Sequence, residues 1–600
     1  MPRRPRTGRP VAGLGTVWTA GWSARQVRAT GTGSVALAVI GVCGADDRQV
    51  REALEWVRAR RWRELTRWPG SYLVVARSGP TLVVIGDLSG QHPVYWRRRP
   101  GGTWWATSAT ALAALGDAPV DPVALAAHLA FGQPDVLAER TLFREVRRVP
   151  TGHLLEVGPG GARTIRYEPL SYAPVLLEEA GPAVRTALTE AVAARRDDRP
   201  VSADLAGLDS TTVACLAARH RPVTAVTFAD PRLRDDDLPY ARRTAAAVPL
   251  LHHHEAPGTP HTLYYAQLAP EDIAALPFTD APHAYTVTAA IKRSVLDTVR
   301  TRQGPGVHLT GVAGDGVLSA PDAYLADLLR ERRYRHAWRH AQGHARLRQT
   351  SVRTLADRIR PAARHDLPTC WRQTAALLRR APRPWVPQAQ RPLAWTPLLA
   401  TADWMPPTAR HQLADALTAA ADSLIEAPTR LADWTDNQDL ARVGANAAGW
   451  RALALAEHGI DIATPYLDNE VRRACLAVPA EQRGAPGRFK PLLAAAFADT
   501  SEVPGFVLAR TTKGGFNALS YAGLARHAAT VRNLLGPSSR LGALGLVTEA
   551  PVVAMLRRAA TGQPTAQGAL HTAVATEVWL RRLHHAAPAW WEVTGRVATA

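Results

Sequence analysis

The chain is 600 residues long and carries a formal net charge of +20, with 72 basic against 52 acidic residues. This length excludes a single hydrophobic core and predicts two domains, and the lack of any run of about 20 apolar residues excludes a membrane-spanning segment. Four scattered cysteines without a CxxC spacing argue against a zinc site and a disulfide framework, so we expect a soluble protein of the reducing cytoplasm.

The first 170 residues read as short strands separated by turns rich in Gly and Pro, with one helix near residues 121–131. Cys43 closes an apolar run that begins at Val35, which favours a buried structural thiol over a reactive one. We therefore predict a layered, β-rich domain over residues 1–175.

A linker from Pro174 to about Ala183 leads into alternating strands and helices. The expected elements are strands 201–206, 223–228 and 306–311 and helices 211–219 and 237–246. Such alternation predicts a parallel sheet, and beyond residue 320 the pattern becomes mainly helical. The second domain, over residues 180–600, should therefore combine a parallel sheet with a helical periphery, so the fold class is α/β and α+β.

A glycine turn follows the first of these strands. It reads Ala206-Gly207-Leu208-Asp209-Ser210-Thr211. Backbone N–H groups at the start of a helix attract anions, so a phosphate group is the expected ligand of this turn. Ser210 and Thr211 could cap the helix or donate to phosphate, and Asp209 would repel it unless Mg²⁺ lay between them. An ordinary strand-to-helix crossover with capping hydroxyls explains this turn about equally well.

A second turn of the same kind follows strand 306–311 and contains Gly314 and Asp315. Ligands of open parallel sheets bind beyond the carboxyl ends of the strands, so Asp209 and Asp315 could hold one metal-bound polyphosphate. The alternative is a plain Asx-type turn at Asp315.

Lysine is scarce in this arginine-rich chain. Lys292, Lys490 and Lys513 are its three lysines. A lysine is then expected where a compact point charge is needed. Lys292 lies outside any motif and is expected to tolerate replacement by Arg. For Lys490 the competing interpretation is a surface charge at a helix start.

These segments resemble the asparagine synthetase-like ATP pyrophosphatases, whose loops read Ser-Gly-Gly-x-Asp-Ser and Gly-Gly-Asp-Glu. The likeness continues over about residues 180–530 in three further segments: Thr464-Pro465-Tyr466-Leu467-Asp468, Phe489-Lys490-Pro491-Leu492-Leu493 and Arg510-Thr511-Thr512-Lys513-Gly514-Gly515-Phe516. The first loop is one residue shorter than the family pattern, and Gly316 stands where Glu is common.

The resemblance implies ATP and Mg²⁺ as cofactors and assigns residues to them. It places Asp209 and Asp315 on the metal, residues 206–211 and Gly314 on the nucleotide, and Lys513 and Lys490 in catalysis. In this chemistry a carboxylate becomes an acyl-AMP with release of pyrophosphate, and cations must surround the polyphosphate.

The front domain resembles the class II glutamine amidotransferase domain of asparagine synthetases. The matching segments are Asp87 to Tyr95 and Val149-Pro150-Thr151-Gly152-His153. That domain depends on an N-terminal cysteine, whereas this sequence begins Met1-Pro2-Arg3. We therefore expect a scaffold without the nucleophile, and an attacking amine that belongs to the substrate itself.

Two branches of the family use the amine of the substrate, the β-lactam synthetases and the lasso peptide macrocyclases. Val312 stands where β-lactam synthetases carry a tyrosine of their base dyad, and Leu125 to Gly132 and Pro321 to Leu329 resemble the lasso branch. The resemblance implies a cyclase that adenylates an Asp or Glu side chain of a precursor peptide and joins it to the α-amine of the peptide, with AMP and pyrophosphate released. A leader peptidase and a leader-binding protein would be partners. The alternatives are an amide ligase acting on a small amino acid and a non-catalytic peptide-binding scaffold.

An arginine-rich block covers residues 330–391 and has three open interpretations: a solvated helix face, a surface for an acidic peptide or protein, and, least favoured, a nucleic-acid surface. The run from His252 to Glu255 could suggest a metal cluster, but consecutive strand residues face opposite sides, so a strand entering a turn is the better interpretation.

Overall fold

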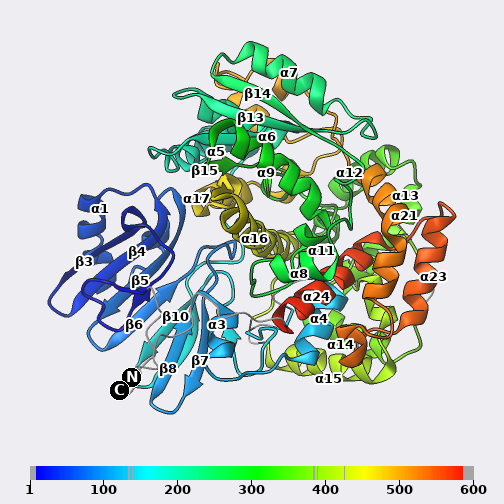
Figure 1. The fold of residues 1–600 in the computed structure, drawn as a ribbon, viewed down its shortest axis with the longest axis horizontal. Coiled ribbons are helices and arrows are strands. Elements are labelled where there is room, and N and C mark those ends of the chain that lie inside the picture. Colours follow the sequence, from blue (N-terminus) through cyan, green and yellow to red (C-terminus); the bar gives the residue numbers. More distant parts are fainter. Residues whose placement is uncertain are drawn as a thin grey trace.

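The fold is taken from a computed structural model, which describes residues 8–132, 136–137, 139–382, 385–387, 390–424 and 426–584. Antiparallel strands gather in the N-terminal part, and a parallel sheet surrounded by helices follows (Figure 1). This arrangement confirms the predicted mixture of parallel and antiparallel sheets with helices. No helix among the described residues is long and apolar enough to cross a membrane.

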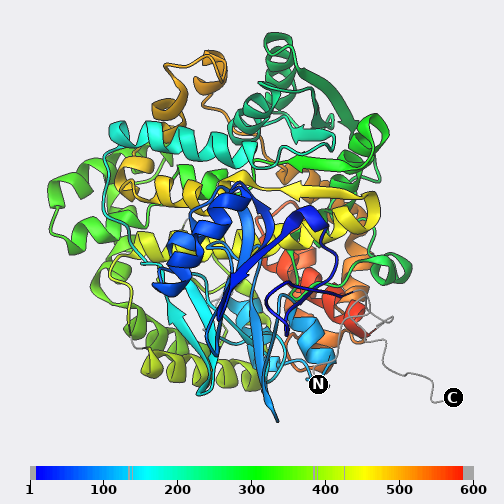
Figure 2. The same cartoon turned by 90° about the vertical axis from the view of Figure 1, so that its left-hand side faces the viewer.

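Within the described residues, the N-terminal part contains a six-stranded antiparallel sheet in the order β11-β10-β6-β5-β4-β3. Its strands are β3 (Val27–Thr32), β4 (Val35–Cys43), β5 (Gly70–Ser78), β6 (Thr81–Ile85), β10 (His153–Gly158) and β11 (Gly161–Arg166). A second sheet contains β7 (Tyr95–Arg99), β8 (Gly102–Ala106) and β9 (Arg147–Arg148), and a ribbon pairs β1 (Arg9–Pro10) with β2 (Trp18–Thr19). These strands face the viewer in Figure 2.

The parallel sheet has the order β14-β13-β12-β15-β16. Its strands are β12 (Val201–Asp204), β13 (Val223–Ala229), β14 (Leu251–Pro257), β15 (Gly306–Leu309) and β16 (Ile460–Ala463). The inner strands are β13, β12 and β15. Strands β12 and β15 are buried along their length apart from Asp204, although they carry the polar residues Ser202 and His308. The strand β16 was not predicted, because it lies in a region whose sequence is otherwise helical.

Helices surround both kinds of sheet. In the N-terminal part they are α1 (Asp47–Glu52), α2 (Leu54–Arg58), α3 (Ala109–Ala114) and α4 (Pro122–Phe131). Next to the parallel sheet they are α5 (Leu177–Ala193), α6 (Leu208–Ala218), α7 (Asp237–Ala247), α9 (Ala289–Gln303), α10 (Gly314–Leu318), α16 (Leu431–His458), α17 (Asn469–Leu476), α18 (Ala480–Arg483), α19 (Pro491–Phe497) and α20 (Gly505–Leu508). Helix α8 (Pro270–Ala275) packs against the last described helix. Farther out are α11 (Tyr324–Arg330), α12 (Tyr334–Leu347), α13 (Val352–Arg364), α14 (Leu367–Leu378), α15 (Pro407–Ser423), α21 (Asn517–Leu534), α22 (Arg540–Ala543), α23 (Glu549–Ala560) and α24 (Gln567–His584).

Several predicted boundaries were wrong. The segment expected to be a linker up to Ala183 is helical from Leu177, because the apolar side chains of Leu177, Ala180 and Val184 lie at helical spacing and are buried. The strand expected over 201–206 ends at Asp204, and its helix begins at Leu208 instead of residue 211. The sequence predicted one helix in the first 170 residues, which is α4. In the described part of this region the structure has three further α-helices, α1, α2 and α3.

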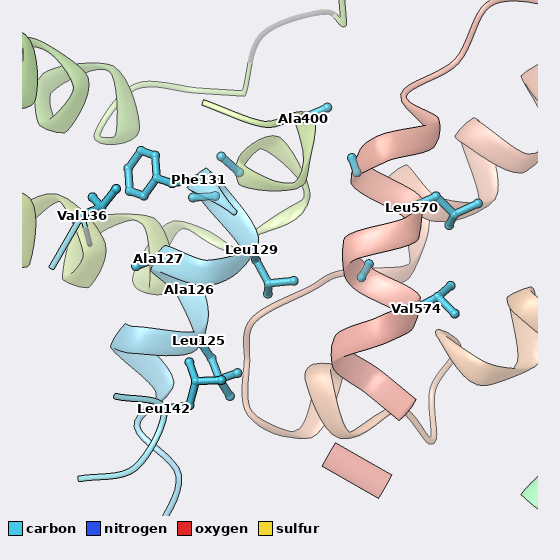
Figure 3. Close-up of a cluster of buried hydrophobic side chains, with 14 of the residues drawn as sticks. Leu125, Ala126, Ala127, Leu129, Phe131, Val136, Leu142, Ala400, Leu570 and Val574 are labelled. Carbon is cyan, nitrogen blue, oxygen red and sulfur yellow. The ribbon is translucent and has the colours of Figure 1, made fainter. Parts of the chain in front are cut away.

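Helix α4 shows how sequence signals set the ends of an element. Asp121 caps its start by accepting from the backbone N–H groups of Val123 and Ala124, Pro122 occupies the first turn, and Gly132 ends it with a φ of 62°. Leu125 and Leu129 of α4 share one buried cluster with Leu570 and Val574 of α24 (Figure 3). The N-terminal part is therefore packed into the same core as the end of the described chain.

The turn after β6 docks on the helical part of the molecule. The carboxylate of Asp87 accepts from the backbone N–H groups of Ser89 and Gln91, which fixes the turn. Leu88 N donates to the side chain of Asn469 (2.9 Å), and Ser89 Oγ donates to Leu467 O (3.1 Å). The segment that follows β16 is thus held by the N-terminal part.

Candidate active site

The first glycine turn lies between β12 and α6, with Gly207 preceding the first helical residue. Ser210 Oγ donates to Gly207 O (3.1 Å) and accepts from Ala206 N (3.3 Å), and Thr211 Oγ1 donates to Ala206 O (3.4 Å). Both hydroxyls therefore hold the turn in shape. Thr211 N also donates to Gly207 O (3.1 Å), so the first helical turn already encloses Leu208 and the helix begins earlier than predicted.

Asp209 is buried at this helix start and lies directly against the second glycine turn. A Cβ added at Gly314 would lie 2.3 Å from Cγ of Asp209, so only glycine allows this approach. Tyr466 OH donates to the backbone O of Asp209 (3.2 Å) from the segment after β16. The two glycine turns and this segment thus meet at one residue, Asp209, at the carboxyl ends of β12, β15 and β16.

Lys490 lies between the two aspartates that the sequence singled out. Its Nζ is 2.5 Å from Oδ2 of Asp209 and 2.9 Å from Oδ1 of Asp315, and its side chain is 4% exposed. The backbone of Lys490 adopts the left-handed region (φ 45°, ψ 58°) immediately before Pro491, a conformation that costs about 1–3 kcal/mol. The interpretation of Lys490 as a surface charge was wrong.

Lys513 contacts the same cluster from the solvent side. Its Nζ lies 2.5 Å from Oδ2 of Asp315, while the side chains of Lys513 and Asp315 are 62% and 57% exposed. Burial alone would raise the pKa of Asp315, but the charges of Lys490 and Lys513 lower it below its usual range. The four side chains therefore alternate in sign, from buried Asp209 through Lys490 and Asp315 to exposed Lys513.

The protonation state of the buried end is set by its surroundings. Burial and the charge of Asp315 raise the pKa of Asp209 to about 6, against the opposing effect of Lys490. Burial lowers the pKa of Lys490, but Asp209 and Asp315 outweigh it and raise the pKa. Asp209 Oδ1 is buried and has no hydrogen-bond partner among the described residues, so one carboxylate oxygen is left without a donor.

This raised pKa predicts a pH-dependent stability. The carboxyl of Asp209 titrates at about 6 in the folded chain and near 3.8 when unperturbed. Between these values the folded state holds the additional proton, so stability falls as the pH rises through this window, by roughly 3 kcal/mol. We expect Asp209→Asn, which cannot titrate, to gain Tm relative to the parent chain over that pH range. Thermal unfolding at a series of pH values measures this, and parallel curves for the two proteins would contradict it.

Arg510 connects the late basic loop to the first glycine turn, and the sequence did not single it out as a site residue. Its guanidinium donates to Ala206 O (2.7 Å) and to Oδ1 of Asp237 (2.5 Å), and it also pairs with Asp236. A Cβ at Gly514 would lie 2.4 Å from Oδ2 of Asp237, so the loop that carries Lys513 packs closely on the acidic turn before α7. The sequence signal that could have indicated Arg510 was its position three residues before Lys513 in the same loop.

Lys292 lies among aromatic side chains, which its position outside any sequence motif did not indicate. It lies in the first turn of α9, with Nζ 3.9 Å from the ring centroid of Trp450 and 5.3 Å from that of Tyr285. Burial lowers the pKa of Lys292, and nearby Asp204 opposes this shift. The half-buried side chain of Lys292 therefore lies over the rings of Trp450 and Tyr285, between α9 and α16.

We expect Lys292→Arg to lower Tm, because the larger guanidinium must be accommodated between Trp450 and Tyr285, and overpacking costs about 1–3 kcal/mol. Thermal unfolding measures this effect. Lys513→Arg is the matched control, since Lys513 is 62% exposed and the same exchange should leave Tm unchanged. Equal Tm values for all three proteins would show that Lys292 tolerates Arg, as the sequence had suggested.

Two further sequence features are accounted for by the fold. Residues Leu251–Pro257 form strand β14, and no group of three or more His, Cys, Asp or Glu side chains able to hold a metal ion exists in the described parts of the chain. In the arginine-rich block, Arg348 pairs with Asp322 and Arg379 with Asp415, which favours a solvated helix face for these arginines. Arg383 of the same block lies outside the described residues.

Comparison with known proteins gives one family match. A family described as asparagine synthase matches residues 183–581. No curated protein matches the chain. Among solved structures, the glutamine phosphoribosylpyrophosphate amidotransferase from B. subtilis, complexed with ADP and GMP, is 12% identical, with a TM-score of 0.17. The match covers 49% of this chain and 63% of that one, so this chain spans less than two thirds of its length.

Proposed function

The chain belongs to the asparagine synthase family, and on that premise we propose that it is an ATP-dependent amide-forming ligase that closes a macrolactam in a peptide. Family membership indicates an ATP-dependent ligase. The macrolactam, AMP as a product and the lasso peptide branch are our proposal. The domain division at residues 1–175 and 180–600 is part of it.

The observation that carries the proposal is the alternating charge cluster of Asp209, Lys490, Asp315 and Lys513 at the carboxyl ends of β12 and β15. A triphosphate needs donors and cations around it, together with carboxylates that can share a metal. Four separate segments of the chain, which begin near residues 204, 309, 489 and 510, supply these four groups. Ligands of open parallel sheets bind at this edge.

The residues fit a magnesium ion. Asp209 Oδ1 is a buried carboxylate oxygen without a donor among the described residues, and Asp315 is the neighbouring carboxylate. Hard oxygen ligands of this kind are what Mg²⁺ prefers. Bound there, Mg²⁺ would supply charge neutralisation on the polyphosphate.

We propose the following roles for the side chains of this chain. The N–H groups at the start of α6 and at Gly314 bind phosphate oxygens, and Arg510 keeps the first turn closed by holding Ala206 O. The substrate carboxylate attacks the α-phosphorus of ATP, and the bond to the β-phosphate breaks, giving acyl-AMP and pyrophosphate. Lys490 and Lys513 hold the charge of the departing pyrophosphate.

Amide formation then needs a neutral amine. The α-amine of the peptide attacks the acyl carbon, AMP leaves, and the amine proton passes to solvent. An α-amino pKa near 8 leaves a useful neutral fraction at neutral pH, so a strong base is not required. The half-buried side chain of Val312, beside the second turn, cannot act as one.

The partners follow from the same proposal. A leader-processed precursor peptide supplies both the carboxylate, from an Asp or Glu side chain, and the amine. A leader peptidase and a leader-binding protein would prepare and deliver it. We further propose that the protein acts in the cytoplasm.

The proposal is tested by incubating the purified chain with ATP, Mg²⁺ and a synthetic core peptide. We expect AMP and pyrophosphate in equal amounts and a peptide product lighter by one water. AMP release that depends on a small amino acid instead of the peptide would favour the other amide ligases of the family. Peptide binding without any ATP consumption would identify a non-catalytic scaffold.

A further inference from the structure

A cleft of about 550 Å³ opens in the N-terminal part, away from the charge cluster. Its walls come from β2, from β8 and α3, and from inward side chains of the six-stranded sheet. The aromatic lining consists of Trp18, Trp22, Trp104 and Trp105. A volume of this size is typical of sites that bind a small ligand or a short peptide segment.

The lining of this cleft carries no charged side chain among the described residues, although the chain as a whole has a net charge of +20. Its polar groups are threonine and serine hydroxyls and the ring of His92, which lies 5.6 Å from the ring of Trp22. Burial lowers the pKa of His92 to about 4, so the imidazole is neutral at physiological pH. The guanidinium groups of Arg99 and Arg451 lie 5.7 and 5.4 Å from the ring centroids of Trp104 and Trp22, but neither arginine lines the cleft. A charged group entering the cleft would therefore lose hydration without a counter-charge in direct contact, which favours an uncharged ligand.

Two strands border the cleft, each paired on one side only in the part of the chain that the structure describes. Its lining includes the continuous runs 16–20 and 101–108, which contain β2 and β8. In the described residues β2 pairs with β1 alone and β8 with β7 alone. Each strand therefore presents one row of backbone N–H and C=O groups without a strand partner.

We propose that this cleft binds an extended, uncharged peptide segment, which adds as a strand to the free edge of β8 and places apolar side chains among the four tryptophans. Backbone hydrogen bonds to an edge give affinity in such complexes, and pockets for alternate side chains give specificity. Strand β8 spans Gly102–Ala106, which at about 3.3 Å per residue matches a segment of about five residues.

The biological role of this cleft rests on the proposed function, since a ligase that closes a peptide must also hold those residues of the peptide that do not take part in the new bond. The test of the binding proposal is independent of that function because binding is measured without ATP. A failure of the ligase proposal would leave the binding result standing, and the reverse also holds.

The probe is the capped, neutral, strand-forming peptide acetyl-Thr-Val-Thr-Phe-Thr-Val-amide, titrated into the full chain by isothermal calorimetry. We expect saturable binding at a ratio of one to one. Two further probes carry N-methyl groups on alternate amides, in the two possible phases. Only one phase should lose at least tenfold in affinity, because alternate amides of a strand point to opposite edges.

Thr103→Arg places a charge and a long side chain in the cleft from within β8, and we expect it to lower the affinity at least tenfold. Thr32→Arg makes the same exchange on β3, an edge strand of the six-stranded sheet that does not line the cleft, and should leave binding unchanged. Absence of binding, equal loss for both methylated probes, or equally tight binding of a probe with Glu in place of Phe would overturn the proposal. So would competition by indole alone at the same affinity, which would identify a small-molecule site.

Discussion

Lys490→Met is expected to lower pyrophosphate release by at least about 10²-fold, with Lys490→Arg no better. The side chain is 4% exposed and its Nζ contacts two carboxylates at 2.5 and 2.9 Å, so its replacement removes the cation that lies between Asp209 and Asp315. The planar guanidinium of Arg cannot occupy that point between them. Steady-state release of pyrophosphate measures the loss.

Arg488→Met provides the matched control for this variant. Arg488 is exposed, lies two residues earlier on the same loop, and its replacement by the same residue should leave activity unchanged. Thermal unfolding of both variants separates catalysis from folding. If Lys490→Met retained activity with an intact fold, Lys490 would not be required for pyrophosphate release and the prediction would be wrong.

Asp209→Asn and Asp315→Asn are each expected to reduce ATP–pyrophosphate exchange by at least about 10²-fold while the chain stays folded. Each exchange removes one negative charge and keeps the shape of the side chain, so the loss is one of charge neutralisation at the polyphosphate. For Asp209 the atom expected to bind the metal is Oδ1, which is buried and accepts no hydrogen bond from the described residues. Exchange of labelled pyrophosphate into ATP is the direct measurement.

Asp357→Asn is the control for these exchanges, because Asp357 is 57% exposed and pairs with Arg360 on the surface of α13. It should behave as the parent chain. Raising the Mg²⁺ concentration should recover part of the activity in Asp315→Asn, since the exposed carboxylate is the more replaceable ligand. Near-normal exchange in both active-site variants would remove the metal assignment.

Local pattern was enough to predict the mixture of sheets and the family. The glycine turns after β12 and β15 follow from short segments that end in Gly and Asp, a local pattern that predicts a strand followed by a turn. The match of the asparagine synthase family over residues 183–581 confirms the coarse family assignment. The roles of Asp209, Asp315, Lys490 and Lys513 stay predictions, although the structure brings these four side chains together.

The tertiary structure decided which lysine is central. In the sequence, Lys513 was the stronger candidate and Lys490 could have been a surface charge, yet Lys490 is the buried one. Burial depends on what packs over a residue, and here residues 209 and 315 approach from segments far away in the chain. Lys292 shows the same effect, since nothing near it in the sequence indicates the rings of Trp450 and Tyr285.

By itself, then, the sequence determined the existence of β12, β13 and β15, the glycine turns after β12 and β15, and the residue types able to hold a polyphosphate, because these depend on neighbours along the chain. Only the tertiary structure decided the pairing of Lys490 with two aspartates, the raised pKa of Asp209 and the uncharged cleft beside β8. Each of these arises from desolvation or from contacts between distant segments. Both effects depend on the packed arrangement of the whole chain and have no signature in local sequence.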